Sequence, residues 1–275
     1  MSRSWRVPVL TYHGLFAPGW DYHENDHVAL EQDLALFGRM GLKVVPLSVL
    51  AAHLFGKPDV RLEQGRFVAL SFDDGPDFDY LDYQHPDWGY LRSFRNLLLD
   101  QATLGWDGGI PRATSFVIAS PQARAELDRS CIAGRNQWRD DWWREAADEG
   151  VLEIANHSWD HTHETLQSLA VNPEHRGVFD RIREFDSADA EILEAEKYIR
   201  KITGKRSVPL FAYPYGESND FLVNEYFPAR SEWFRAAFTT SGEHLNKGSR
   251  RWELPRYVCG EHWKSPEDLI KILNS

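Results

Sequence analysis

The sequence predicts an α/β protein built on a mostly parallel sheet with helices outside it. Short apolar runs of strand length alternate with segments whose apolar residues recur every three or four positions. Repeated alternation of this kind is typical of parallel sheets, whose strands need crossover connections. Polar residues suited to catalysis recur where the predicted strands end, which is the edge where such sheets place their sites. No internal repeat or low-complexity linker interrupts the pattern, so we expect one domain over residues 1–275.

The N-terminal elements follow from apolar runs and one clear helical pattern. In the segment 28–40 apolar residues keep helical spacing up to Gly41, which can adopt the left-handed conformation that ends helices. Ser48 can cap the next helix. In order, the expected elements are a strand over 7–11, a helix over 28–40, a strand over 43–47, a helix over 48–55 and a strand over 66–72.

The C-terminal elements continue the alternation. The clearest helix covers 188–202, where Ile192, Ile199 and Ile202 share one face and Gly204 follows as a stop. The expected elements are a strand over 114–119, a helix over 142–149, a strand over 151–155, the helix over 188–202, strands over 208–213, 235–240 and 256–259, and a helix over 266–273.

One segment, about 76–111, is too long for a simple connection and reads as an insertion after a strand. It is acidic and aromatic, and a helix over 90–101 is expected inside it. A long loop that leaves a catalytic strand is often a lid or a binding wall. The alternative is a surface excursion without a role, and the sequence leaves both open.

The composition limits the classes of partner. The net charge is −11, which argues against nucleic acid or an anionic membrane as the main partner. The eleven Trp residues exceed what a core needs, and flat rings also stack on sugars. Cys131 and Cys259 are far apart and lack metal-ligand spacing, so we interpret them as two buried free thiols.

The N-terminal region has no apolar segment of signal-peptide length, and no run is long enough to span a bilayer. We therefore expect a cytoplasmic protein without a membrane span, although a trimmed chain would look the same. The sequence does not predict an oligomeric state.

Two short segments about eighty residues apart carry the chemistry. Each follows a strand-like run, and together they supply Asp73, Asp74, His157 and His161. Neighbouring side chains at a strand end point to opposite sides, so one carboxylate can bind a metal while the other stays free. Two His at positions i and i+4 can face one metal if the segment begins a helical turn. Three of the four groups can hold a divalent ion, and the fourth can accept a proton from water. The pattern predicts a metal-dependent hydrolase.

These residues resemble the motifs of a known family, the polysaccharide deacetylases with the NodB homology domain (carbohydrate esterase family 4). The similar segments are Ser-Phe-Asp-Asp-Gly at 71–75, Ala-Thr-Ser-Phe-Val at 113–117, His-Ser-Trp-Asp-His at 157–161 and Pro-Tyr-Gly at 214–216. One such motif is weak, but four in order are a specific signal. The resemblance covers nearly the whole chain and implies a distorted (β/α) barrel.

The resemblance also implies roles for individual residues. Asp73 corresponds to the general base, and Asp74, His157 and His161 correspond to the ligands of one divalent metal ion, Zn²⁺ first and Co²⁺, Ni²⁺ or Mn²⁺ as alternatives. The backbone N–H of Tyr215 corresponds to the group that helps to bind the oxyanion. Pro214, Tyr215, His13 and Trp159 are the expected substrate-binding residues.

Two positions depart from the family pattern. The third motif usually carries an Arg shortly before Pro-Tyr-Gly, and here no Arg precedes it; Arg256 is the expected substitute. The motif that supplies the catalytic acid is not obvious, which leaves His262, His244 and His13 as candidates, His262 first. His163 is an alternative metal ligand, but i, i+4 spacing favours His161.

The leading hypothesis is hydrolysis of an N-acetyl group on a sugar, a glycan or a sugar precursor. The second is hydrolysis of another C–N bond, in an amide, formamide or imide, on the same scaffold. The third is a carbohydrate-binding protein without catalysis. Retention of a free base beside three ligands argues against the third, because binding alone does not need it.

Overall fold

The computed structural model describes residues 5–14, 19–56, 62, 65–85, 89–132, 134–169 and 173–275. Its main element is a sheet of eight parallel strands within these residues, in the order β10-β9-β8-β7-β4-β2-β12, with β3 paired to β4. The strands are β2 (Val9–His13), β3 (Lys43–Val44), β4 (Phe67–Asp73), β7 (Ala113–Val117), β8 (Leu152–Asn156), β9 (Leu210–Ala212), β10 (Ala236–Phe238) and β12 (Tyr257–Val258).

The sheet is curled, and the segment before β12 brings its two edges together. Leu254 forms a parallel bridge with Phe238 of β10, and it exchanges hydrogen bonds with Ala237 and Thr239. The chain then enters β12, which pairs with β2 at the other edge. The architecture is the predicted distorted (β/α) barrel, with a short bridge in place of one full strand pairing.

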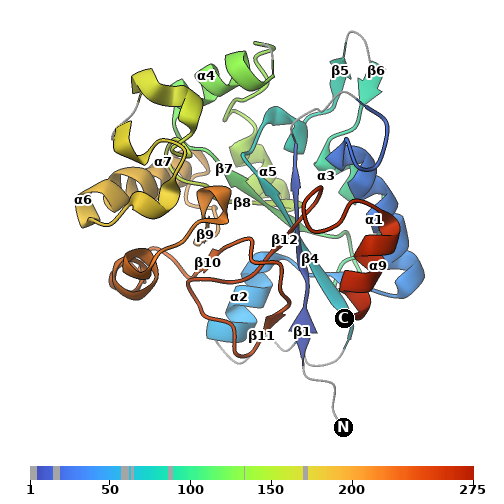
Figure 1. The fold of residues 1–275 in the computed structure, drawn as a ribbon. Coiled ribbons are helices and arrows are strands. Elements are labelled where there is room, and N and C mark those ends of the chain that lie inside the picture. Colours follow the sequence, from blue (N-terminus) through green and yellow to red (C-terminus); the bar gives the residue numbers. More distant parts are fainter. Residues whose placement is uncertain are drawn as a thin grey trace.

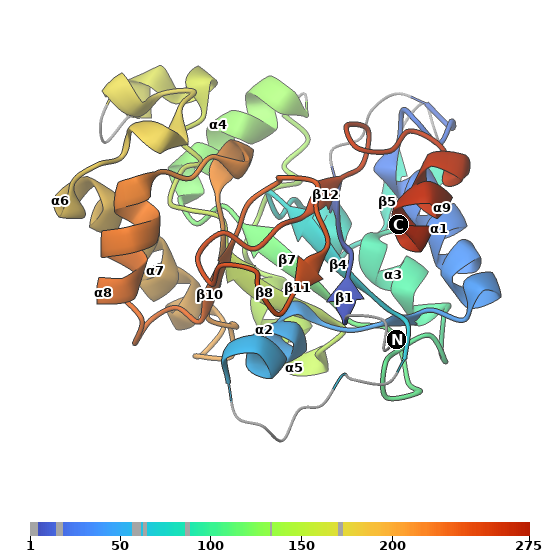
Figure 2. The same cartoon turned by 60° about the horizontal axis from the view of Figure 1, so that its bottom comes forward.

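Helices surround the strands in both views (Figures 1 and 2). Figure 1 shows α1 and α9 on one flank of the sheet and α6 and α7 on the opposite flank. The helices are α1 (Asp26–Met40), α2 (Leu47–Phe55), α3 (Phe94–Leu99), α4 (Pro121–Cys131), α5 (Trp143–Glu149), α6 (Phe185–Ala188), α7 (Glu194–Ile202), α8 (Phe227–Ala229) and α9 (Pro266–Asn274). Two antiparallel pairs join β1 (Arg6–Val7) to β11 (Leu245–Asn246) and β5 (Tyr83–His85) to β6 (Gly89–Leu91).

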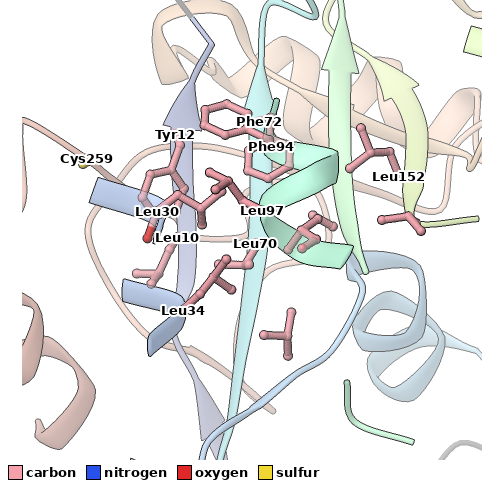
Figure 3. Close-up of a cluster of buried hydrophobic side chains, with 14 of the residues drawn as sticks. Leu10, Tyr12, Leu30, Leu34, Leu70, Phe72, Phe94, Leu97, Leu152 and Cys259 are labelled. Carbon is pink, nitrogen blue, oxygen red and sulfur yellow. The ribbon is translucent and has the colours of Figure 1, made fainter. Parts of the chain in front are cut away.

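The sheet has an apolar core on each side. Inside the barrel, Val9, Phe116 and Phe238 belong to a fully buried cluster. Outside it, α1 and α3 cover β2 and β4, and Figure 3 shows the side chains that meet there. The labelled apolar residues of these four elements are Leu10, Tyr12, Leu30, Leu34, Leu70, Phe72, Phe94 and Leu97. Packing on both faces fixes the strands, and so their carboxyl ends.

Several local expectations need correction. The helix expected from Ser48 begins at Leu47 after Pro46, and the Ser48 hydroxyl bonds to Glu153 instead of capping the helix. Cys131 is exposed, so only Cys259 fits the interpretation as a buried thiol. The helix expected over 188–202 is interrupted by one π-helical turn at Asp189–Leu193. None of the helices in the described ranges is long and apolar enough to cross a membrane.

The segment 76–111 is mainly a packing element along its described part; residues 86–88 lie outside the described ranges. The expected helix is the shorter α3, which buries Phe94, Leu97 and Leu98 against the core. A 3₁₀ turn at Asp77–Asp79 is buried as well. The structure therefore matches neither a free surface excursion nor, as the cavity below shows, a wall of the site.

Candidate metal centre and its cavity

A cavity of about 290 Å³ lies where the strands end. β2 delivers His13 to it and β4 delivers Asp73, and these two residues are register partners. No described residue of the segment 76–111 lines the cavity. Its walls are formed by His13, Asp73, Asp74, Ile118, Leu127, Cys131, Trp138, His157, His161, His163, Tyr215, Gly216, Thr240, Val258 and Glu261.

Asp73 is held by Arg256, the residue expected to replace the missing Arg of the third motif. The Arg256 guanidinium is fully buried and lies over the Phe116 ring inside the barrel. Its Nη1 donates to Asp73 Oδ1 at 2.6 Å and its Nη2 donates to Oδ2 at 2.8 Å. Burial acts to raise the pKa of Asp73, but Arg256 and then His157 outweigh it and hold the pKa below its ordinary value. The carboxylate is therefore ionised at neutral pH.

Asp74, His157 and His161 form the only group of potential metal ligands found among the described residues, with their ligand atoms within 4.8 Å of one another. Asp74 Oδ1 lies 3.6 Å from His157 Nε2 and 3.7 Å from His161 Nε2. The His157 Nδ1–H donates to the Ala212 carbonyl at 2.9 Å, because a carbonyl can only accept. This bond leaves the Nε2 lone pair of His157 directed at the cluster.

The donor set fits a divalent metal. Burial, and then the neighbouring imidazoles of His157, His163 and His13, lower the pKa of His161 well below its ordinary value. Metal ligation needs the neutral imidazole, so this environment favours the ligating form. Two imidazole nitrogens and one carboxylate oxygen suit Zn²⁺ and, with less preference, Co²⁺, Ni²⁺ or Mn²⁺.

Two of the three candidate ligands, and several residues beside them, lie on strained backbone. Five of the seven described non-glycine residues with positive φ belong to this site, namely Asp74, Ser158, His161, Thr162 and Tyr215. The segment 157–161 therefore does not begin a helical turn, although both imidazoles still face Asp74. Left-handed backbone at non-glycine residues persists only where surrounding contacts enforce it. One such contact is Trp138, whose Nε1–H donates to the Asp74 carbonyl at 3.1 Å.

Tyr215 forms part of the wall above the metal cluster. Its ring meets the His161 ring edge-on with centroids 4.5 Å apart, and the side chain is 42% exposed. Burial of the remainder raises the pKa of Tyr215 to about 12, so the phenol is neutral at pH 7. Its backbone φ of 58° aims the Pro-Tyr-Gly turn at the cavity.

The structure separates the remaining predicted residues into two groups. His13 and His163 line the cavity, whereas Pro214, His244 and His262 are not among its described walls. The His262 Nδ1 accepts a hydrogen bond from the Val258 N–H, and its ring lies against Gly242.

Trp159 was expected to contact substrate, but it points away from the cavity. Its indole packs against Tyr198 and the outer core, because the left-handed backbone at Ser158 and His161 turns it away from the cavity. In the other direction, sequence reasoning missed Trp138, Thr240 and Glu261, all of which line the cavity. They come from loops, and no short-range pattern marks them.

Comparisons with known proteins support the family resemblance and the fold. The family model described as "Polysaccharide deacetylase" matches residues 108–227, which contain both candidate His ligands and the Pro-Tyr-Gly turn but not Asp73, Asp74 or Arg256. No protein of curated function matches the sequence.

Two solved structures share the fold. One is the Streptococcus pyogenes deacetylase PplD in complex with acetate, with a TM-score of 0.66, 16% identity, and coverage of 98% of this chain and 99% of that one. The other is the BpsB deacetylase domain from Bordetella bronchiseptica, with a TM-score of 0.59, 15% identity, and coverage of 92% and 96%.

Proposed function

We propose that the chain is a metal-dependent hydrolase of the polysaccharide deacetylase family, whose model matches residues 108–227, and that it removes an N-acetyl group from a sugar or a glycan precursor. The observation that carries the proposal is the division of labour in the Asp pair. Asp73 pairs with the buried Arg256, whereas Asp74 lies within 3.7 Å of two imidazole nitrogens. Binding alone would not need this division.

In this proposal Asp74, His157 and His161 hold the metal. A bound divalent cation supplies Lewis acidity that activates water and polarises a carbonyl. Asp73 accepts the proton that water loses as its oxygen forms a bond to the acetyl carbon. The backbone N–H of Tyr215 donates a hydrogen bond to the oxyanion. This bond lowers the barrier because the negative charge on the carbonyl oxygen develops in the transition state. The C–N bond then breaks, which gives acetate and an amine.

The amine must receive a proton as it leaves. Of the three acid candidates, His13 is favoured by its position, because it lines the cavity and lies opposite Asp73 in register. The His13 backbone N–H donates to Asp26 at 2.7 Å, which fixes the end of β2 and so the start of this side chain. His262 was the first choice from sequence, and its ring position beside Gly242 makes it the weaker candidate.

The test is release of acetate from N-acetylated sugars, measured on a panel that runs from monosaccharides to oligomers, with formamide and cyclic-imide substrates beside them. We expect acetate release that a chelator abolishes and added Zn²⁺ or Co²⁺ restores. Turnover of formamides or imides without acetate release would instead support hydrolysis of another C–N bond. Tight sugar binding with no turnover in any metal would support a carbohydrate-binding protein.

A further inference from the structure

We propose that Arg176 is a positioning residue for the metal ligand His161; this inference rests on the proposed metal site. Arg176 lies outside the cavity wall and belongs to none of the predicted motifs. Its side chain is 7% exposed, and its Nη2 donates to Asp160 Oδ2 at 2.7 Å. Asp160 directly precedes His161, so the ion pair acts on the peptide that carries the ligand.

Asp160 transmits this contact to both sides of His161. Its Oδ1 accepts the Thr162 N–H at 2.9 Å, which closes a tight turn around the ligand. The residue after Arg176, Gly177, donates its N–H to the Thr162 carbonyl at 2.8 Å. The Arg176-Gly177 pair therefore holds the backbone around His161 through a side chain and through a main-chain bond.

The turn needs this support because it is strained. His161 has φ of 64° and Thr162 has φ of 45°. Left-handed backbone at a non-glycine residue is unfavourable and stays in place only when its surroundings enforce it. On its other side the turn is anchored to Glu191, whose carbonyl accepts the Trp159 N–H at 2.7 Å. Arg176 supplies the anchor on the side of His161.

The charge balance supports the same reading. Asp160 is only 2% exposed, so its carboxylate needs a cation. Glu191 lies beside it, and burial together with Asp160 raises the pKa of Glu191 well above its ordinary value. Within the described part of the chain, Arg176 is the cation in contact with Asp160. Loss of Arg176 would leave a buried carboxylate beside the ligand without its counter-ion.

The experiment measures Zn²⁺ affinity directly, by competition with a chromophoric chelator, and records the absorption spectrum of the Co²⁺ form. For Arg176→Met we expect a dissociation constant about 10–100-fold higher, the usual cost of losing an outer-shell partner. We also expect an altered Co²⁺ spectrum, because the position of His161 changes. Arg176→Lys keeps one cationic donor for Asp160 and should restore part of the affinity.

Arg206→Met is the control. Arg206 pairs with Asp148 at 2.7 Å, outside both the ligand loop and the turn that carries Glu191, so we expect wild-type affinity and an unchanged Co²⁺ spectrum. A second check is a double-mutant cycle with Asp160→Asn. If Arg176 acts through Asp160, the two changes should not add.

Wild-type Zn²⁺ affinity and Co²⁺ spectrum in folded Arg176→Met would overturn the inference alone. Should Arg176→Met fail to fold, the uncharged Arg176→Gln decides by the same criteria, and an unchanged affinity and spectrum in that variant overturn the inference. A wild-type chain that binds no divalent metal overturns the proposed function, and the inference with it.

Discussion

The two halves of the site, one around Asp73 and one around Asp74, differ in how the charge of the aspartate is balanced. In the base half, Asp73 ends a regular strand and receives two hydrogen bonds from a fully buried Arg256. In the ligand half, Asp74, His157 and His161 bring a carboxylate and two imidazoles together, and two of the three residues adopt left-handed backbone. In the base half the charge of Asp73 is balanced by Arg256. In the ligand half the three potential ligand atoms lie close together, in an arrangement that suits a bound cation.

This difference explains how neighbouring carboxylates can have separate roles. The Arg256 guanidinium lies inside the barrel over Phe116, where it pairs with the carboxylate of Asp73. The turn after Asp73 has φ of 74° at Asp74, which directs the second carboxylate to the His side of the cavity. Backbone geometry therefore assigns one carboxylate to the arginine and the other to the ligand cluster.

The largest expected effect breaks the ligand half. His157→Ala or His161→Ala should each remove most bound metal, because two protein ligands hold a divalent ion far less well than three. The loss should exceed the roughly 100-fold that an outer-shell change costs. Elemental analysis of the purified variants measures it, with His163→Ala as the control that keeps its metal. Full occupancy in both single variants would show that other residues bind the ion.

The next effect breaks the base half without touching the metal. Asp73→Asn keeps the shape of the side chain but removes its capacity to accept a proton. We expect a loss of about 10²–10⁴ in rate, with metal content and circular dichroism unchanged. Steady-state kinetics on the best acetylated substrate provides the measurement. Near-normal turnover would mean that another group is the base.

Arg256→Met removes the counter-ion that distinguishes the two halves. Burial then acts on Asp73 unopposed by the guanidinium, so the pKa of Asp73 should rise. The base works only when ionised, and a higher pKa therefore moves the acidic limb of the pH–rate profile to higher pH. The variant should also lose about 3–5 kcal/mol of stability, since a buried carboxylate is left unpaired. An unaltered profile in folded protein would rule out this role.

Sequence reasoning recovered the parts of the molecule that depend on local pattern. The strands ending at Asp73 and Asn156 and the helix ending at Gly41 follow from apolar spacing and a glycine stop, and they lie within a few residues of the prediction. The contact of Arg256 with Asp73 was also expected, because a buried base requires a cation and the usual one is missing.

What the sequence did not predict depends on contacts between distant loops. Trp159 lies between two predicted ligands, yet its side chain enters the outer core because the turn around it has left-handed residues. Trp138 reaches the Asp74 carbonyl from 64 residues away. Such placements follow from tertiary packing, and no motif or periodicity records them.

The smallest expected effect concerns Asp33, a buried carboxyl group that contacts two tyrosine hydroxyls, in contrast to Asp73, which pairs with an arginine. Asp33 accepts hydrogen bonds from Tyr12 at 2.8 Å and Tyr22 at 2.7 Å. Burial raises the pKa of Asp33 to about 7 despite these bonds. The folded state therefore holds this proton more tightly than the unfolded state does. Its contribution to stability is fully present below about pH 4 and is lost as pH rises to about 7, on the order of 4 kcal/mol at 1.36 kcal/mol per unit.

Asp33→Asn should remove that dependence, because the amide stays neutral. The measurement is urea unfolding of wild type and variant at pH 5 and at pH 8. At each pH the free energy of unfolding of the variant is subtracted from that of wild type, which removes the contribution of the other titrating groups. We expect the difference to fall by about 2–3 kcal/mol between the two pH values, over the two pKa units that remain above pH 5. Asp186→Asn, at an exposed position, should show no such trend. A pH-independent difference for Asp33 would mean that its tyrosine partners stabilise the ionised form, as Arg256 does for Asp73.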